Sequence, residues 1–321
     1  MSKVLITGSS GFVGKNLVKY LELDDFFDVT TVNRKPQIED DKNISFSNFY
    51  LDDSLFFHNY IHLAGKAHDI KNTSNSEEYF EINFELSKKV FQKFLQDSEA
   101  ETFIYISSIK AVRDCAETVL TENLEPDPQT AYGLSKLKSE QYIFSNCPVG
   151  KKVIILRPCM IHGPENKGNL NLLYKFISKG IPYPLGAYSN IRSFLSIENL
   201  CFILSQIIKK PIESGVYHIS DDHPISTKDL IEIMGDSIGK KSKIIHIPKP
   251  IISGIAKVGD HLRLPLNSDR LRKLTENYIV SNSKLMRTLL VELPVSSQEG
   301  LFQTFKSFQK LCIIFLPYAL F

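Results

Sequence analysis

The sequence predicts an α/β fold in which a doubly wound parallel sheet, covered by helices on both faces, is followed by a smaller C-terminal α/β lobe. Through the first 160 residues, short and nearly continuous apolar runs alternate with segments of helical spacing. A strand that is buried on both faces of a parallel sheet has this continuous apolar character. After residue 164, glycine and proline interruptions become frequent and the helical segments shorten, which indicates a second lobe.

The expected elements follow one another along the chain. Apolar runs and helical spacing predict strands at residues 4–6, 29–32, 60–64, 102–106 and 153–156, and helices at 13–23, 79–95 and 131–144. We therefore expect a first domain at residues 1–162 and a second lobe at residues 163–310, with a segment near 190–210 returning to the first domain. Residues 311–321 form an uncharged apolar tail of unknown role, too short to span a bilayer and expected to be buried within the protein.

The composition excludes several classes of protein. The 321 residues include 38 lysines and arginines against 36 acidic residues, a net charge of only +2, which gives no basis for a nucleic-acid or anionic-membrane partner. No run of 18 apolar residues and no signal-peptide core is present, so we expect no membrane span and a cytoplasmic location. The five cysteines are scattered without C-x-x-C spacing, which favours reduced thiols and no metal site.

A glycine-rich turn follows the first expected strand. Gly8, Gly11 and Gly14 have the spacing G-x-x-G-x-x-G, and Phe12 and Val13 open the helix that follows. Glycines allow a tight turn and a close approach of the backbone to a pyrophosphate, while the helix start directs its N–H groups at the phosphates. Because the motif lies between a strand and a helix, it predicts that residues 1–162 form a Rossmann-type NAD(P)-binding domain.

The end of the second strand indicates which dinucleotide is bound. An acidic residue there favours NAD, whereas an arginine accommodates the 2′-phosphate of NADP. This chain has Asn33 and Arg34 followed by Lys35, with no acid. The segment therefore favours NADP over NAD, the alternative being an ordinary solvated basic turn.

A candidate catalytic set lies further along the chain. Tyr132 and Lys136 form a Y-x-x-x-K pattern, and on a helix residues four apart share a face. A nearby ammonium lowers the pKa of a phenol, which suits the tyrosine for acid/base catalysis. Ser107 and Ser108 follow the strand at 102–106, where a serine hydroxyl can hold a substrate oxygen on which charge develops.

With these motifs, the chain resembles the extended short-chain dehydrogenase/reductase family, in its nucleotide-sugar epimerase/dehydratase branch. The resemblance covers nearly the whole chain. It rests on residues 7–14, His62-Leu63-Ala64-Gly65, Asn83, Ser107-Ser108, Tyr132 with Lys136, residues 157–164 (RPCMIHGP) and residues 192–197 (RSFLSI).

The resemblance implies a role for each matched position. Tyr132 is expected to be the acid/base, Lys136 its activator and a ribose ligand, and Ser108 the donor to the substrate oxygen, with Ser107 as the alternative. The expected cofactor-binding residues are Gly8, Gly11, Phe12, Val13, Gly14, Asn33, Arg34, Asp52 (or Asp53), Leu63, Ala64, Gly65, Asn83, Ser107, Tyr132, Lys136 and Pro158. The expected substrate-binding residues are Ser108, Asn171, Arg192 and Arg272 (or Arg270). The expected substrate is a nucleotide-diphosphate sugar, and the expected assembly is a homodimer.

The chain departs from the family pattern in three places. Only ten residues separate Asp52 from His62, so the helix that usually precedes this histidine is shortened or absent. His162 replaces the tyrosine of R-P-x-x-V-Y-G-P, where it either donates to a substrate or caps the turn. Ile109 and Lys110 stand where dehydratases of the family carry the Asp-Glu pair that eliminates water, which disfavours a dehydratase.

Three functions stay open on the sequence. The first is a 4-keto reductase acting on a UDP-linked 4-keto-6-deoxy sugar in surface-polysaccharide synthesis, which the NADP-like segment favours. The second is a nucleotide-sugar 4-epimerase of the UDP-glucose or UDP-N-acetylglucosamine type with tightly bound NAD, which uses the same serine, tyrosine and lysine. The third is a cofactor-binding regulator without catalysis, which is disfavoured because Tyr132 and Lys136 are both present.

Overall fold

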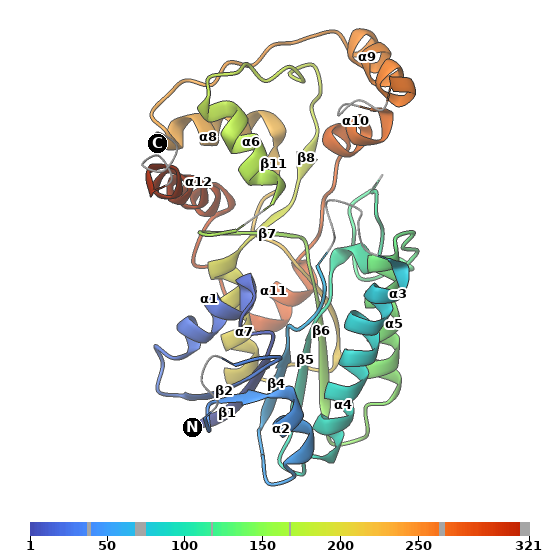
Figure 1. The fold of residues 1–321 in the computed structure, drawn as a ribbon, viewed down its shortest axis with the longest axis vertical. Helices are drawn as coiled ribbons and strands as arrows, with labels where there is room; N and C mark the ends of the chain where they lie inside the picture. The colour runs from blue at the N-terminus through green and yellow to red at the C-terminus, as the bar shows by residue number, and fades with distance from the viewer. Residues whose placement is uncertain (37–39, 68–74, 117, 167, 263–266, 315–321) are drawn as a thin grey trace.

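A seven-stranded parallel sheet forms the lower half of the molecule (Figure 1). This computed structural model describes residues 1–36, 40–67, 75–116, 118–166, 168–262 and 267–314, with the backbone alone described at residues 169 and 310–314. The strand order is β10-β6-β5-β4-β1-β2-β3, and every neighbouring pair is parallel. The strands are β1 (Ser2–Thr7), β2 (Phe27–Asn33), β3 (Asn43–Ser45), β4 (Asn59–His62), β5 (Thr102–Ile106), β6 (Lys152–Pro158) and β10 (Gly215–Ile219). The predicted doubly wound α/β fold is therefore confirmed.

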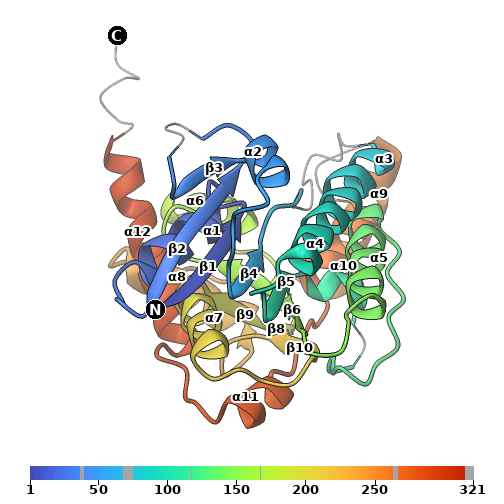
Figure 2. The ribbon, with the colours of Figure 1, turned by 90° about the horizontal axis from the view of Figure 1, so that it is seen from below.

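Helices cover both faces of the sheet, as Figure 2 shows from below. One face carries α1 (Phe12–Leu21), α7 (Ile197–Lys209) and α11 (Ser283–Leu289), and the other carries α2 (Phe46–Leu51), α4 (Leu86–Gln96) and α5 (Ala131–Ser145). Successive residues of a strand point to opposite faces. Accordingly, Ile6 packs in the same apolar cluster as Leu200 of α7, while Leu5 packs with Phe91 of α4.

The helical segment expected at 79–95 is present but is not uniform. It consists of α3 (Ser76–Tyr79), a six-residue π-helix (Phe80–Glu85) and α4. A π-helical turn widens the backbone and is frequent at functional sites. The turn contains Asn83, which is fully buried.

The second lobe lies beyond the C-terminal ends of the strands (Figure 1). Its helices are α6 (Asn169–Ser178), α8 (Thr227–Ser237), α9 (Lys249–Leu262), α10 (Ser268–Thr275) and α12 (Ser297–Ile314). They enclose an apolar core of their own, which includes Leu230, Ile231 and Phe305. Two small sheets accompany it, with β7 (Met160–His162) parallel to β9 (Phe194–Ser196) and β8 (Ile191–Arg192) antiparallel to β11 (Ile225–Ser226).

Several segments after residue 190 pack on the first domain. Helix α7 packs against α1, in the range where a return of the chain is expected. The return extends further than residues 190–210, because β10 pairs with β6 and α11 packs on β10. Of the apolar tail, residues 311–314 continue the backbone of α12, and residues 315–321 lie outside the described residues. Among the helices of the described ranges, none is long and apolar enough to cross a bilayer.

Candidate active site

The glycine-rich turn packs too closely for side chains. Gly8 has a φ of +77°, and a Cβ on it would lie 2.6 Å from the backbone nitrogen of Ala64. A Cβ on Gly14 would lie 2.3 Å from the carbonyl oxygen of Gly8. A positive φ and such close backbone contacts both require glycine. The turn is therefore held against the loop that follows β4, and Gly8 and Gly14 serve the geometry that a pyrophosphate cradle needs.

The start of α1 is suited to bind an anion. Gly11 is the N-cap residue, no side chain caps the helix, and its first turn, which contains Phe12 and Val13, has no acidic residue. The first N–H groups of a helix have no partners within the helix and form its positive end. This arrangement fits the phosphates of a dinucleotide, because the phosphates supply acceptors where the chain provides none.

Asn33 is fixed to the glycine-rich turn. Its side-chain amide donates to Ser9 Oγ at 2.8 Å, and Ser9 Oγ donates to Asn33 Oδ1 at 3.0 Å. Arg34 follows immediately and is exposed. The end of β2 thus presents an arginine, and no acid, at the edge of the turn.

His62, at the end of β4, organises the floor of the site. Its Nδ1 lies 2.6 Å from Thr7 Oγ1 and its Nε2 lies 2.9 Å from Ser87 Oγ. Burial, together with the charge of Lys136, lowers the pKa of His62 to about 3, so the ring is neutral. Thr7 Oγ1 also accepts from the Ala64 backbone N–H at 3.3 Å. The ring therefore fixes the end of β4, and with it the Leu63-Ala64-Gly65 segment, beside the end of β1.

Asn83 connects this segment to the helix that carries the tyrosine. Its Oδ1 accepts from the Lys66 N–H at 2.7 Å, and its Nδ2 donates to Ser135 Oγ at 3.0 Å. A Cβ on Gly65 would lie 2.9 Å from Asn83 Oδ1 and 3.4 Å from the Lys136 ammonium. Gly65 therefore has to be small, and the structure brings it beside Lys136.

The side chain of Ser108 interacts with that of Tyr132. Burial raises the pKa of Tyr132, and the interaction with Ser108 opposes this rise. The ring of Tyr79 packs edge-on against that of Tyr132, with centroids 6.0 Å apart. The tyrosine is placed by Thr130, whose hydroxyl caps α5 by accepting from the Gly133 N–H at 3.2 Å.

Lys136 lies one turn further along α5 and is buried. Its ammonium donates to the Ile106 carbonyl at 2.9 Å and lies 4.8 Å from the centre of the Tyr105 ring. Burial lowers the pKa of Lys136 to about 8, although the nearby Glu140 carboxylate opposes the change. The lysine is thus fixed to the end of β5, which is the strand that leads into Ser107 and Ser108.

The two serines have different partners. Ser107 donates to Glu140, which is also paired with Arg157 through Nη2 and Oε2 at 2.5 Å. Glu140 and Arg157 are 3% and 5% exposed, so this is a buried ion pair. Ser107 therefore helps to complete a buried structural network, while Ser108 is the member of the pair that contacts Tyr132.

Pro158, another expected cofactor residue, is the last residue of β6. It is buried at the C-terminal end of that strand, opposite Ile219 of β10.

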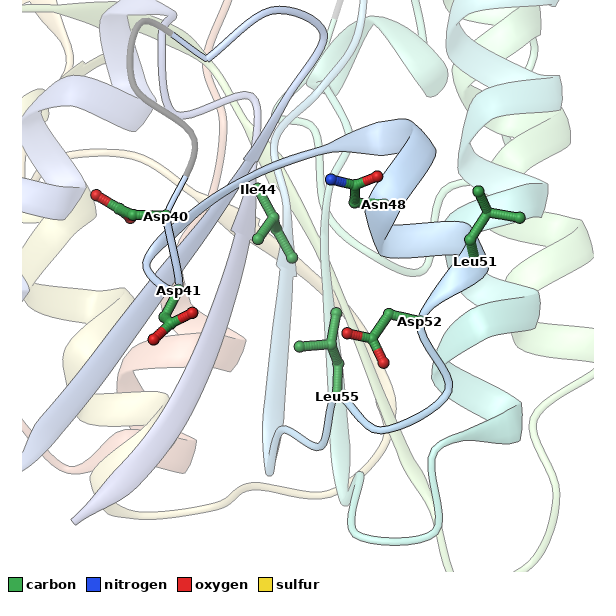
Figure 3. Close-up of a pocket in the computed structure, with 7 residues that line it drawn as sticks. All are labelled: Asp40, Asp41, Ile44, Asn48, Leu51, Asp52 and Leu55. Carbon is green, nitrogen blue, oxygen red and sulfur yellow. The ribbon is translucent and has the colours of Figure 1, made fainter.

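Asp52 does not join the other expected cofactor residues. Helix α2 carries the chain back from the end of β3, so Asp52 follows its C-terminus near the starts of the strands (Figure 3). It lines an open hollow of about 550 Å³ with Asp40, Asp41 and others. The neighbouring Asp53 pairs with Lys93, at the end of α4.

The end of β3, at Ser45, lies level with Asn33, so Ser45 and Phe46 occupy the edge of the sheet where Asp52 was expected. Helix α2 has six residues, which agrees with the expected shortening.

Ser108 lies on the first domain, and the other expected substrate residues, Asn171, Arg192 and Arg272, lie on the second lobe. Arg192 donates to the carbonyls of Lys273 and Glu276, so it lies beside the end of α10 that carries Arg272. Burial lowers the pKa of Arg192. Arg272 is exposed and pairs with Asp269 at 3.0 Å. Asn171 is part of α6, where its Oδ1 accepts from the Gly168 N–H at 3.1 Å.

A residue that motif spacing did not select links the serine loop to Arg192. The Lys110 ammonium lies 4.3 Å from the centre of the Tyr278 ring and donates to the Asp114 carbonyl at 2.6 Å. Tyr278 in turn forms a β-bridge with Arg192. Ile109, the residue before Lys110, is buried in the core. The positions of the dehydratase acid pair therefore hold an apolar residue and a cation, as expected.

His162 is a packing residue. It is fully buried, its Nδ1 lies 2.9 Å from Thr304 Oγ1 of α12, and its Nε2 lies 3.5 Å from Asp221 Oδ2. The Asp221 carboxylate also accepts from the Ser196 N–H. The histidine joins β7 to α12, and of the two expected roles this geometry supports the structural one.

The fold and the glycine-rich turn define a Rossmann-type α/β protein. The chain belongs to the NAD-dependent epimerase/dehydratase family, whose sequence profile matches residues 4–220.

Curated relatives include 4-epimerases as well as a reductase. The chain is 30% identical to a UDP-glucose 4-epimerase of Vibrio cholerae, over 95% of each chain. It is 26% identical to the N-acetyl-alpha-D-glucosaminyl-diphospho-ditrans,octacis-undecaprenol 4-epimerase of Escherichia coli O157:H7, over 77% of this chain and 76% of the relative. It is 24% identical to the GDP-6-deoxy-D-mannose reductase of Pseudomonas aeruginosa, over 77% of this chain and 83% of that protein.

Solved structures share the fold over almost the whole chain. UDP-glucuronic acid 4-epimerase from Bacillus cereus, in complex with NAD, superposes with a TM-score of 0.72 at 19% identity, covering 96% of this chain and 99% of that one. RMD from Pseudomonas aeruginosa, complexed with NADPH, gives a TM-score of 0.68 at 19% identity, covering 96% and 98%. At these identities the likeness concerns the fold.

Proposed function

We propose that this protein catalyses NAD(P)-dependent hydride transfer at C4 of a nucleotide-linked sugar, with Tyr132 as the acid/base. The observation that carries the proposal is the interaction of the Ser108 side chain with that of Tyr132, with Lys136 one helical turn further along α5 and fixed to the end of β5. These groups lie beyond the C-terminal ends of β5 and β6, where ligands bind in open parallel sheets. The glycine-rich turn and the uncapped start of α1 are the elements that would hold the dinucleotide.

In the proposed reaction the chain manages the proton while the bound dinucleotide accepts or supplies the hydride at C4. The Tyr132 phenolate removes the proton of the sugar 4-hydroxyl when C4 is oxidised, and the Tyr132 phenol returns a proton to that oxygen when C4 is reduced. Ser108 donates to the same sugar oxygen and holds the charge that develops on it. Lys136, one helical turn from Tyr132 and with a pKa lowered to about 8, is the proposed activator of the phenol and a proposed ligand of the ribose.

Among reactions of this type, we propose 4-epimerisation as the activity to test first. The relatives from Vibrio cholerae (30% identical) and Escherichia coli O157:H7 (26% identical) are both named as 4-epimerases, and the first is matched over 95% of each chain. In an epimerase the hydride taken from C4 returns to the opposite face of the keto sugar, so no cofactor is consumed.

The proposed substrate is a uridine-diphosphate sugar. Arg192 and Arg272 are the proposed ligands of its diphosphate, because a guanidinium matches the diphosphate oxygens. A homodimer and a cytoplasmic location belong to the same proposal.

The second candidate is a 4-keto reductase that uses NADPH. The observation that favours it is the end of β2, where Arg34 is exposed beside Asn33 and no acid is present. Net reduction consumes cofactor, and an arginine at this position suits the 2′-phosphate of NADP.

One experiment separates the two reactions. The purified protein is denatured and the released nucleotide identified, and the native protein is then given either UDP-hexoses or a UDP-4-keto-6-deoxy-N-acetylhexosamine with NADPH. Stoichiometric bound NAD and interconversion of UDP-hexoses establish the epimerase. Substrate-dependent NADPH oxidation without bound NAD establishes the reductase. Tight dinucleotide binding without turnover of any of these sugars would contradict both.

A further inference from the structure

Helix α9 exposes a continuous row of apolar side chains. Ile251, Ile255, Val258 and Leu262 are 55%, 47%, 54% and 65% exposed. Their spacing of four, three and four residues places them along one stripe of the helix. The buried residues of α9 are Ile252, Ala256 and Gly259, and α9 packs against α10. The exposed row is therefore separate from the face that holds the helix to the lobe.

The chain around this stripe is strongly basic. Residues 240–262 contain five lysines and one acidic residue, which gives a net charge of +4, whereas the whole chain carries +2. All five lysines (Lys240, Lys241, Lys243, Lys249 and Lys257) are exposed. The one acid, Asp260, accepts from the N–H and hydroxyl of Ser268 at 2.9 and 2.6 Å. The near-neutral charge of the whole chain thus conceals a local excess of positive charge.

Helix α9 lies at the far end of the second lobe, away from the sheet. Figure 1 shows it at the top of the molecule together with the long connection that leads to it from α8 and carries the first three of these lysines. An exposed apolar row, on a helix that also carries the exposed Lys249 and Lys257 and lies at one end of the molecule, has the character of a helix that lies in a membrane interface. A protein partner helix would instead be expected to need a groove to enter.

We propose that α9, with Ile251, Ile255, Val258 and Leu262 inserted at the level of the lipid headgroups, docks this protein on an anionic bilayer surface. The lysines of residues 240–257 contact the anionic headgroups, while the apolar row enters the boundary between headgroups and acyl chains. The contact is peripheral and places the second lobe at the membrane. It does not rest on the proposed reaction, because none of these residues belongs to the candidate active site.

Vesicle binding by the full-length protein tests the proposal. The protein is sedimented with vesicles of phosphatidylcholine containing 30 mol% phosphatidylglycerol, and with vesicles of phosphatidylcholine alone. The expected result is binding to the anionic vesicles, at least tenfold stronger than to the neutral ones and weakened by salt. The variant Ile255→Ser/Val258→Ser should lose at least tenfold in binding, and Lys240→Gln/Lys241→Gln/Lys243→Gln should remove the preference for anionic vesicles.

A matched control isolates the position of the stripe from exposed apolar area in general. Leu23→Ser/Val149→Ser also removes two exposed apolar side chains, but from the first domain, and should leave vesicle binding unchanged. Absence of binding to anionic vesicles, or equal loss in the control, would overturn the proposal. So would a stripe variant that binds vesicles normally but changes from dimer to monomer in light scattering, because the stripe would then be an interface between two copies of the chain.

Discussion

The side chain of Ser108 interacts with that of Tyr132, although the two residues lie on different elements. The loop after β5 brings Ser108 to the tyrosine because Gly133 lets the Lys110 backbone approach α5, where a Cβ on that glycine would lie 2.4 Å from the Lys110 carbonyl oxygen. The neighbouring Ser107 donates to Glu140 instead. This division between two adjacent serines leads to predictions that separate the chemistry from the stability of the fold.

Replacing Tyr132 tests the proton step. Tyr132→Phe keeps the ring that packs against Tyr79 and removes only the hydroxyl. We expect kcat to fall by roughly 10²–10⁴-fold, because the acid/base group is lost, while the affinity for the dinucleotide changes little. Tyr142→Phe, on the same helix, is the control and should retain full activity. A Tyr132→Phe enzyme as active as the wild type would contradict the proposed role.

Substitution of the two serines by alanine should have different effects on kcat and on the free energy of unfolding. Ser108→Ala removes the donor to the sugar oxygen and should lower kcat by roughly 10²–10³-fold, with little change in the free energy of unfolding. Ser107→Ala removes a hydrogen bond to the buried Glu140 carboxylate and should lower the free energy of unfolding by about 1–3 kcal/mol. Kinetics and urea denaturation on both variants provide the comparison. The reverse pattern would show that Ser107 is the substrate-binding serine.

The ion pair between Glu140 and Arg157 should be costly to break from one side. Glu140→Leu leaves the Arg157 guanidinium buried without a counter-charge, and we expect a loss of about 3–5 kcal/mol in the free energy of unfolding. In the double variant Glu140→Leu/Arg157→Leu the buried guanidinium is removed as well, so much of that loss should be recovered. Denaturant unfolding of the two variants measures both effects. If the double variant were less stable than the single one, the account of the buried pair would be wrong.

Lys136 should produce a pH dependence of stability. Its pKa is about 8 in the folded protein and about 10.4 in an unfolded chain, so between these values the unfolded state binds more protons. The contribution of Lys136 to stability therefore rises with pH in this window, by roughly 1–2 kcal/mol from pH 8 to pH 9.5. Lys136→Met should lack this increment when the two unfolding free energies are compared across the range. Parallel pH profiles for the two proteins would show that the pKa of Lys136 is not lowered.

Arg34 should influence the choice of cofactor. Arg34→Asp replaces a cation suited to a 2′-phosphate by an acid suited to a ribose hydroxyl pair, so we expect the ratio of NADP to NAD affinity to fall by roughly 10–100-fold. Lys35→Asp introduces the same charge one residue later and should change the ratio less. Dissociation constants from cofactor fluorescence give both ratios. An unchanged ratio in Arg34→Asp would show that this side chain does not contact the adenosine ribose.

The sequence was sufficient for the frame of the fold, because buried parallel strands such as β5 and β6 are continuous apolar runs. It was not sufficient for β3, whose three residues include a single apolar one, Ile44. The sequence predicted no strand at β3 and left the helix before His62 shortened or absent, so it did not show that α2 carries Asp52 back toward the starts of the strands. Local spacing locates elements well only where the pattern is long enough to show a period.

The candidate site was predictable where a motif requires a particular backbone and less so where residues meet across the fold. The glycines at 8 and 14 stand at close backbone contacts that only glycine allows, so their spacing between an expected strand and an expected helix identified them. The bond from Ser107 to Glu140 links a strand end to the middle of α5, and no local pattern records such a contact. The same holds for the contacts of His62 with Thr7 and Ser87, which depend on the pairing of β4 with β1 and on its packing against α4.

The most direct test of the central claim follows the hydrogen at C4. UDP-glucose and UDP-N-acetylglucosamine deuterated at C4 are incubated with the purified protein and its bound nucleotide, and the products are examined by NMR. We predict products of inverted configuration that keep the deuterium at C4, with no net consumption of cofactor, and no conversion by Tyr132→Phe. Release of the deuterium to solvent, or an unchanged C4 in a protein that still binds the dinucleotide, would contradict hydride transfer and epimerisation at this carbon.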